Sequence, residues 1–362
     1  MLEFRIGMIR FEILRWKRMS GIRLGKLHSG CDFDSEPVAL RHFCDNIPFQ
    51  KPLSFPRCVT AIPYRDTSLE NDRIAILILR VMHKIMSNRI ITFIGGGNMA
   101  TSLIGGIIKT GYDPKCLWAS EPDATRRKAL EDLFGIHTTE TNTHAIGKAD
   151  TVVFAVKPQL MRQVVMESAD SIRAHRPLLI SIAAGVREPD IRRWLGFDAA
   201  IVRTMPNTPA LVKSGASALY ANFQVSPDQR DQAESLLRSV GITLWVDTEA
   251  HMDVVTALSG SGPAYFFLVM EILEAIGQNL GLTQESARLL TLETAFGAAK
   301  MALESSEQLH TLRTRVTSPG GTTERALSVL EQGNIAELLA RAVQAAHDRS
   351  IELGYQFGDD DG

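Results

Sequence analysis

The pattern of apolar and polar positions divides this chain into an irregular first part and a regular remainder. From residue 89 onward, short runs of β-branched and other apolar residues alternate with stretches that have helical spacing. Continuous apolar runs of this length are typical of strands that helices cover on both faces. The alternation therefore predicts an α/β domain with a doubly wound parallel sheet. The predicted strands are 89–94, 116–120, 136–139, 151–156, 178–185, 199–205, 217–222 and 242–247.

After Asp247 the strand pattern stops and long helical patterns follow. The spacing predicts helices over 263–280, with Gly281 as terminator, and from Thr283, as N-cap, to 304. Asn334 and Glu337 resemble a capping box that opens a helix to 353, which Gly354 ends. The apolar stripe of this last helix contains Ile335, Leu338, Leu339, Ala342, Ala345 and Ala346. So much apolar surface on long helices predicts an all-helical domain that is partly buried against a second subunit.

The first part of the chain shows neither the period of 2 that is typical of strands nor the period of 3.6 that is typical of helices. Residues 1–85 contain five scattered prolines and carry 14 Lys and Arg against 9 Asp and Glu. The Arg-rich stretch 4–27 is compatible with a mitochondrial transit peptide, but we expect Met86 to be the natural start. The predicted organisation is a disordered or non-native N-terminal extension over 1–85, an α/β domain over 86–247, a helical domain over 248–357 and an acidic tail over 358–362.

Composition narrows the functional classes. The 362 residues are 45% apolar and 22% charged, with a formal net charge of −2, which is typical of globular chains. The absence of a basic excess argues against a nucleic-acid partner. The apolar run 74–79 is far short of the about 20 residues that span a bilayer, so no membrane association is expected. Four cysteines form no disulfide framework, which favours the cytoplasm, and we expect no metal site.

The most specific motif is "ITFIGGGNMA", residues 91–100, in which three glycines follow a predicted buried strand. Gly95 permits a tight turn, Gly97 allows a pyrophosphate to approach the backbone, and Ala100 lets helix and strand pack closely. The helix N-terminus then offers free N–H groups to phosphates. The sheet is therefore predicted to be a Rossmann dinucleotide-binding domain. Its predicted cofactor-binding loop is Gly95, Gly96, Gly97, Asn98 and Met99.

The end of the second predicted strand bears on the choice of cofactor. It presents Ser120 and Glu121, and Arg126 and Arg127 follow one turn into the next helix. A carboxylate here usually accepts the ribose 2′-hydroxyl of NAD, whereas an arginine accommodates the 2′-phosphate of NADP. Glu121 thus favours NADH and the arginines favour NADPH, so the sequence leaves both open.

Further motifs occur in a fixed order: "FIGGGNMA", "AVKP" (155–158), "SIAAGV" (181–186), "MPNTPA" (205–210), "SGSGPAY" (259–265) and "TSPGGTT" (317–323). Together they closely resemble the pyrroline-5-carboxylate reductase family, over residues 88 to about 355. The resemblance implies a Rossmann domain followed by an all-helical dimerisation domain. It also implies reduction of 1-pyrroline-5-carboxylate to L-proline, the last step of proline biosynthesis, with NADPH or NADH, by a homodimer or a higher ring of dimers.

The resemblance places the substrate carboxylate on a loop of the helical domain. The implied residues are Ser318, Gly320, Gly321, Thr322 and Thr323, with Thr323 also able to hydrogen-bond the ring nitrogen and so assist catalysis. A plain alternative is that Thr322 or Thr323 caps the helix. Glu249 matches an acidic family position near the substrate, although an acid in the first turn of a helix needs no such role.

The remaining candidates are at the ends of other predicted strands. The resemblance places one group along the nicotinamide side: Ala155, Val156, Lys157 and Pro158. A second group lines the cofactor cleft: Ala183, Ala184 and Gly185. Asn142 and Asn207 match positions near the cofactor, with turn formation as the alternative for each, and Lys157 could equally be a surface charge.

Two other functions share part of this pattern. The β-hydroxyacid dehydrogenases also combine a Rossmann and a helical domain, but they carry a lysine on the first long helix, and 263–281 contains none. A nucleotide-sensing protein without catalysis is the other alternative. The three hydroxyl side chains Ser318, Thr322 and Thr323 argue against it.

Overall fold

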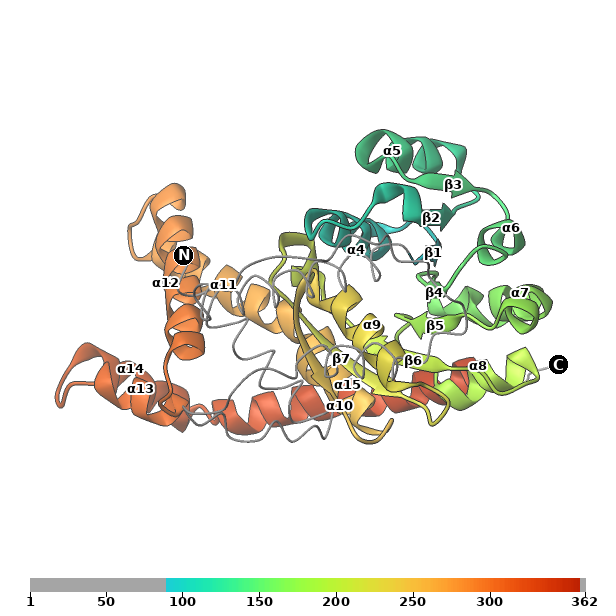
Figure 1. The fold of residues 1–362 in the computed structure, drawn as a ribbon. Coiled ribbons are helices and arrows are strands. Elements are labelled where there is room, and N and C mark those ends of the chain that lie inside the picture. Colours follow the sequence, from blue (N-terminus) through green and yellow to red (C-terminus); the bar gives the residue numbers. More distant parts are fainter. Residues whose placement is uncertain (1–88, 359–362) are drawn as a thin grey trace, which may run out of the picture. The chain divides into compact units, whose positions relative to one another are not determined.

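The computed structural model describes residues 89–358, which Figure 1 draws in colour. The interpretations of residues 1–85 and of the tail beyond 358 lie outside the described part. Within it, every predicted strand is present in one eight-stranded sheet. The strands are β1 (Ile91–Ile94), β2 (Leu117–Ser120), β3 (His137–Thr139), β4 (Thr151–Phe154), β5 (Leu178–Ser181), β6 (Ile201–Met205), β7 (Gly215–Ala221) and β8 (Gly241–Trp245).

The strand order is β3-β2-β1-β4-β5-β6-β7-β8. All neighbours are parallel except β6 and β7, which are antiparallel, so the predicted doubly wound sheet is confirmed as predominantly parallel, with one antiparallel pair. The reason is the short link, residues 206–214, which holds only the 3₁₀ turn η3 (Thr208–Val212). A parallel crossover needs a dozen or more residues, usually with a helix.

Helices cover both faces of the sheet, as the doubly wound fold requires. Phe93 faces a core shared with α4 and α9, whereas its neighbour Ile94 faces a second core shared with α7 and α8. The helices and turns of this part are α4 (Asn98–Lys109), η1 (Pro114–Cys116), α5 (Ala124–Phe134), α6 (Asn142–Ile146), η2 (Pro158–Leu160), α7 (Met161–His175), α8 (Glu188–Leu195) and α9 (Pro227–Arg238).

The rest of the described chain is helical, as predicted. It consists of α10 (His251–Val255), the π-helical turn η4 (Thr256–Gly260), α11 (Gly262–Asn279), α12 (Gln284–Glu304), α13 (Leu309–Arg315), α14 (Thr322–Gln332) and α15 (Ile335–Gly358). Thr283 caps α12 through the Ser286 N–H, as expected. The short η4 and α13 were not anticipated, because each has too few residues to show a period.

The last helix differs from its prediction at both ends. Asn334 has a φ of 59°, and its amide contacts the Glu337 side chain, so the reciprocal capping box is wrong. Gly354 does not end α15, which continues to Gly358. A Cβ at Gly354 would come within 2.6 Å of the Arg187 Nε, so this glycine allows α15 to pack closely against the sheet domain. The buried Ser350 hydroxyl also donates to Asp253 at 2.7 Å.

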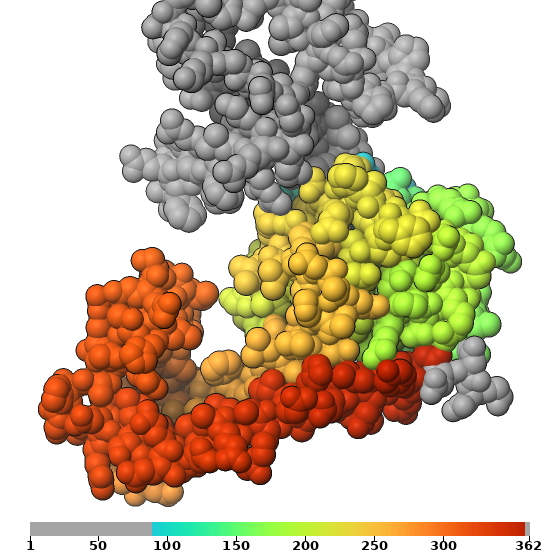
Figure 2. All heavy atoms as spheres, turned by 90° about the horizontal axis from the view of Figure 1, so that it is seen from below, coloured from blue at the N-terminus to red at the C-terminus, as the bar shows by residue number. Residues whose placement is uncertain are grey.

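The helical part exposes an unusual amount of apolar surface. Phe266 and Phe267 on α11 are 69% and 63% exposed, and Phe296 on α12 is 65% exposed. Figure 2 shows α15, in red, running from these orange helices to the green part of the sheet domain. Within residues 89–358, one stretch, His251–Asn279, is long and apolar enough by composition to cross a membrane, and 11% of its most apolar window is buried.

Candidate active site

The glycine loop begins where β1 lies between β2 and β4. Ile94, the last residue of β1, pairs with Ser120 on one side and Phe154 on the other. The strand order reverses at this point, and ligands of open α/β sheets bind in the crevice at such a reversal. The residues that follow the three strand ends therefore share one edge of the sheet.

The two outer glycines of the loop have different roles. Gly95 has a φ of 100°, and a Cβ there would lie 2.7 Å from the Ala155 carbonyl oxygen. Gly97 is the N-cap of α4, and a Cβ there would meet nothing within 4 Å. Gly95 is thus required by the fold, whereas Gly97 borders open space at a helix N-terminus, where phosphates bind.

A cleft of about 410 Å³ opens beside this loop, between α4 and α5. Apart from Arg126, its α5 wall was not anticipated, although the residues recur at i, i+3, i+4 and i+7, which is one face of a helix. The lining residues are Gly96, Gly97, Asn98, Thr101, Arg126, Ala129, Leu130 and Leu133.

Two of the predicted residues at the end of β2 are bonded to neighbouring residues. The Ser120 hydroxyl donates to the Asn142 side chain at 2.7 Å, which connects the end of β2 to the start of α6. Glu121 is a buried residue, with 6% of its surface exposed. It accepts the Gly96 N–H at 2.9 Å and the Asp123 N–H at 3.1 Å. Glu121 therefore holds the glycine loop in place.

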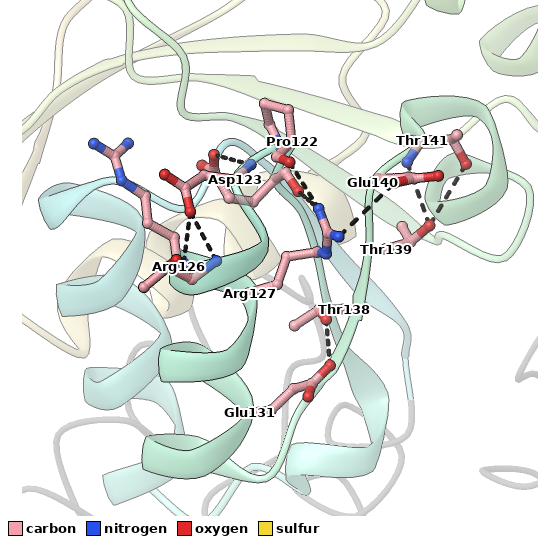
Figure 3. Close-up of polar contacts among 11 residues, drawn as sticks. Pro122, Asp123, Arg126, Arg127, Glu131, Thr138, Thr139, Glu140 and Thr141 are labelled. Atoms are coloured by element: carbon pink, nitrogen blue, oxygen red, sulfur yellow. Dashed lines mark hydrogen bonds and ion pairs between the residues drawn. The ribbon is translucent and has the colours of Figure 1, made fainter.

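The two arginines of α5 have different surroundings (Figure 3). The Arg127 guanidinium donates to the carbonyl oxygens of Glu121 and Pro122 at 2.7 and 2.9 Å and lies 3.8 Å from Glu140. The Arg126 guanidinium has no hydrogen bond or ion pair among the described residues and borders the cleft.

Asp123 is the N-cap of α5. Its carboxylate accepts the backbone N–H groups of Thr125 and Arg126 at 2.8 and 3.1 Å. The Arg126 N–H and then the Thr125 N–H lower the pKa of this carboxyl, with the Arg126 charge adding to them. Asp123 is thus occupied by the helix end.

The loops after β4 and β5 flank the same edge. β4 ends before the four residues Ala155, Val156, Lys157 and Pro158, and Ala155 donates its N–H to Ile94 at 2.8 Å. After β5, Ala183 is buried, and Gly185 has a φ of 79°. A Cβ at Gly185 would approach the Phe357 ring to 3.2 Å, so this glycine also accommodates α15.

Asn207 uses its amide within the protein. Its Nδ2 donates to the carbonyl and hydroxyl oxygens of Ser259, both at 3.2 Å, and its Oδ1 accepts the Ala216 N–H at 2.9 Å. These contacts favour the structural alternative, a link between the β6–β7 loop and the π-helical turn η4. Its cofactor role stays a prediction.

Glu249 lies before α10 rather than in its first turn. Its carboxylate accepts from the buried Arg203 guanidinium at 3.0 Å and from the Glu188 N–H at 2.7 Å. It therefore links the start of the helical part to β6 and α8. A contact with substrate stays a prediction.

The loop before α14 forms a tight turn. Gly320 has a φ of 70°, and Gly321 donates its N–H to Ser318 at 3.0 Å. Gly321, not a threonine, is the N-cap of α14 and makes no side-chain cap bond, so the capping interpretation of Thr322 and Thr323 is wrong. The Glu324 carboxylate accepts the Gly320 N–H at 2.7 Å.

The structure thus brings most predicted cofactor residues to one sheet edge, but it leaves the Ser318–Thr323 loop elsewhere. In Figure 1 this loop lies between α13 and α14, at the end of the helical part away from β1. No group of three or more His, Cys, Asp or Glu side chains within 89–358 is arranged to hold a metal ion.

Comparison with known proteins decides the family. A family model described as "Pyrroline-5-carboxylate reductase dimerisation" matches residues 249–353. A second family model, described as "NADP oxidoreductase coenzyme F420-dependent", matches residues 90–185. A pyrroline-5-carboxylate reductase from Pseudomonas aeruginosa is 49% identical over 75% of this chain and 100% of its own length. The chain belongs to the pyrroline-5-carboxylate reductase family.

Solved structures of this family agree. A pyrroline-5-carboxylate reductase from Coxiella burnetii is 47% identical, with a TM-score of 0.71 over 74% of this chain and 98% of that one. The Plasmodium falciparum enzyme with NADP bound is 30% identical, with a TM-score of 0.66 over 74% and 99%. These matches confirm the resemblance, the Rossmann fold with a helical dimerisation domain, and an NAD(P)H-dependent oxidoreductase.

Proposed function

We propose that this chain reduces 1-pyrroline-5-carboxylate to L-proline with NADPH or NADH, the last step of proline biosynthesis. The observation that carries the proposal is the glycine loop at the reversal of strand order, in a chain that also contains the family's dimerisation segment.

The residues at the sheet edge fit a dinucleotide. Gly97 leaves open space at the N-terminus of α4, and the adjoining cleft is bordered by Arg126. When bound, NAD(P)H supplies the hydride for the imine carbon. The protein's own contribution is placement, with the loop Gly95–Met99 holding the phosphates and Ala155–Pro158 following the nicotinamide side.

The substrate carboxylate is proposed to bind the loop formed by Ser318, Gly320, Gly321, Thr322 and Thr323. The contact between Glu324 and the Gly320 N–H supports this role, because a carboxylate oxygen already fits there at 2.7 Å. We infer that substrate displaces Glu324 from this N–H. The Thr323 hydroxyl, not used as a cap, is then available to the ring nitrogen.

A complete site requires a second copy of the chain, because one copy separates the substrate loop from the glycine loop. The exposed aromatic residues of α11 and α12 belong to the dimerisation segment 249–353. We propose that a second subunit, rather than a membrane, covers them and that dimers can form higher rings.

The exposed apolar surface of α11 and α12 is typical of the large interfaces of obligate dimers. We therefore expect the dimer to persist on dilution. Light scattering at several concentrations is expected to give at least twice the chain mass. A monomer mass independent of concentration would contradict the proposal.

The reaction is tested by following NADPH or NADH oxidation with 1-pyrroline-5-carboxylate as the only acceptor and L-proline as the product identified. Oxidation that depends on this imine and yields proline is expected. Cofactor binding without turnover would favour the nucleotide-sensing alternative. Cytoplasmic location remains a prediction, which cell fractionation would check. The lack of nucleic-acid partners also remains a prediction.

A chain that begins at Met86 is expected to fold and to retain activity. The relative from Pseudomonas aeruginosa is covered to 100% of its length by 75% of this chain, so family members function without an equivalent of the extension. Thermal unfolding and turnover of the truncated chain, compared with the full chain, check this. Insolubility or inactivity of the truncated chain alone would make residues 1–85 part of the fold.

A further inference from the structure

We propose that Arg126 binds the 2′-phosphate of NADPH and that this chain consequently prefers NADPH to NADH. The inference rests on the proposed function for the reaction itself, and it names the residue that selects the cofactor. Glu121, Arg126 and Arg127, three charged residues after β2, differ in what they contact.

Glu121 stands where a ribose-binding carboxylate is found in NAD-dependent Rossmann domains. Here both of its oxygens already accept backbone N–H groups, those of Gly96 and Asp123, and the residue is 6% exposed. A buried carboxylate that accepts two backbone hydrogen bonds holds the glycine loop in place. It offers little surface to the two hydroxyls of a ribose.

The Arg127 side chain is likewise engaged in contacts within the protein. Its guanidinium donates to two carbonyl oxygens and faces Glu140, so it fastens the β2–α5 turn to the residue after β3. Moving it to a phosphate would leave the Glu121 and Pro122 carbonyl oxygens without this donor. Arg127 is therefore a structural residue.

Arg126 is the cation that remains. It lies in the first turn of α5, is exposed, and lines the same cleft as Gly96 and Gly97. Asp123, the N-cap that precedes this helix, accepts the Thr125 and Arg126 backbone N–H groups. A guanidinium without an ion pair that faces the dinucleotide cleft matches a phosphate better than a ribose hydroxyl, because its planar N–H groups pair with phosphate oxygens.

The test compares fragments that differ only at the 2′ position. Calorimetric titration of the full chain with 2′,5′-ADP and with 5′-AMP isolates the 2′-phosphate without any turnover. We expect 2′,5′-ADP to bind the unchanged protein about 10- to 100-fold more tightly, the range of a charge-assisted contact. Arg126→Ala is expected to remove this difference.

Lys128→Ala is the matched control. Lys128 lies on the same helix, two residues further along, and pairs with Asp132 on the surface, away from the cleft. The Lys128→Ala substitution also removes one positive charge from α5, so it shows how much of any change in binding comes from net charge alone. The difference between the two fragments is expected to survive in Lys128→Ala.

A second arm measures kcat/KM for both cofactors. Arg126→Ala is expected to lower the value for NADPH by about the same factor and to lower the value for NADH much less. Equal binding of both fragments by the unchanged protein, or a difference that survives Arg126→Ala, would overturn the inference. A chain that reduces the imine better with NADH would also overturn it while leaving the proposed reaction intact.

Discussion

Gly97→Val is expected to abolish binding of NADPH and NADH while residues 89–358 keep their fold. Gly97 has a φ of −73°, which any residue adopts, and a Cβ there meets no atom within 4 Å. The Cβ of valine is therefore accommodated, and its two methyl groups are expected to occupy the space in front of the α4 N-terminus that the pyrophosphate needs. Replacing glycine by valine at an N-cap costs only about 1 kcal/mol of stability.

The measurement is fluorescence titration with each cofactor, together with thermal unfolding. Gly95→Val is the contrasting variant, because its φ of 100° and the Ala155 carbonyl oxygen at 2.7 Å oppose any side chain. We expect Gly95→Val to lower the Tm and Gly97→Val to leave it nearly unchanged. Near-normal cofactor affinity in Gly97→Val would refute the proposed phosphate position.

Thr323→Ala is expected to reduce turnover with little change in stability. The loss of one hydrogen bond to the reacting system costs at most about 2.7 to 4 kcal/mol, or about 100- to 1000-fold in rate. The ring nitrogen carries less developing charge than an oxyanion, so this range is an upper guide. Because Gly321 is the N-cap, removal of the Thr323 hydroxyl removes no cap, and alanine is the better helix former.

Turnover and the denaturant midpoint are measured on the same preparation. Thr311→Ala is the control, since it removes an exposed hydroxyl from the neighbouring helix α13. That variant is expected to match the unchanged protein in both measurements. Unchanged turnover in Thr323→Ala would remove this residue from the reaction, whatever its effect on KM.

Glycine positions show why part of the site was visible in the sequence and part was not. The loop Gly95–Gly97 was predicted because its signal is local, three glycines between an apolar run and a helical pattern. Gly354 carried an equally local signal for a helix end, and the prediction was wrong. Glycine is needed at position 354 because the side chain of Arg187, which is distant in the chain, occupies the space that a Cβ would fill.

Charged residues show the same division. The sequence placed Glu121, Arg126 and Arg127 beside the cofactor but left the choice between NADH and NADPH open. The structure separates their roles through contacts with Gly96, Asp123, Pro122 and Glu140, which no spacing rule contains.

By itself, the sequence determined the alternation of strands and helices, the dinucleotide loop, the change to an all-helical part and the family. These features depend on neighbouring residues, through buried apolar runs, helical periods and backbone freedom at glycine. Tertiary structure decided the length of α15, the partners of Asn207 and Glu249 and the separation of the substrate loop from the glycine loop. Those depend on contacts between residues distant in the chain, whose energies appear only when the elements pack together.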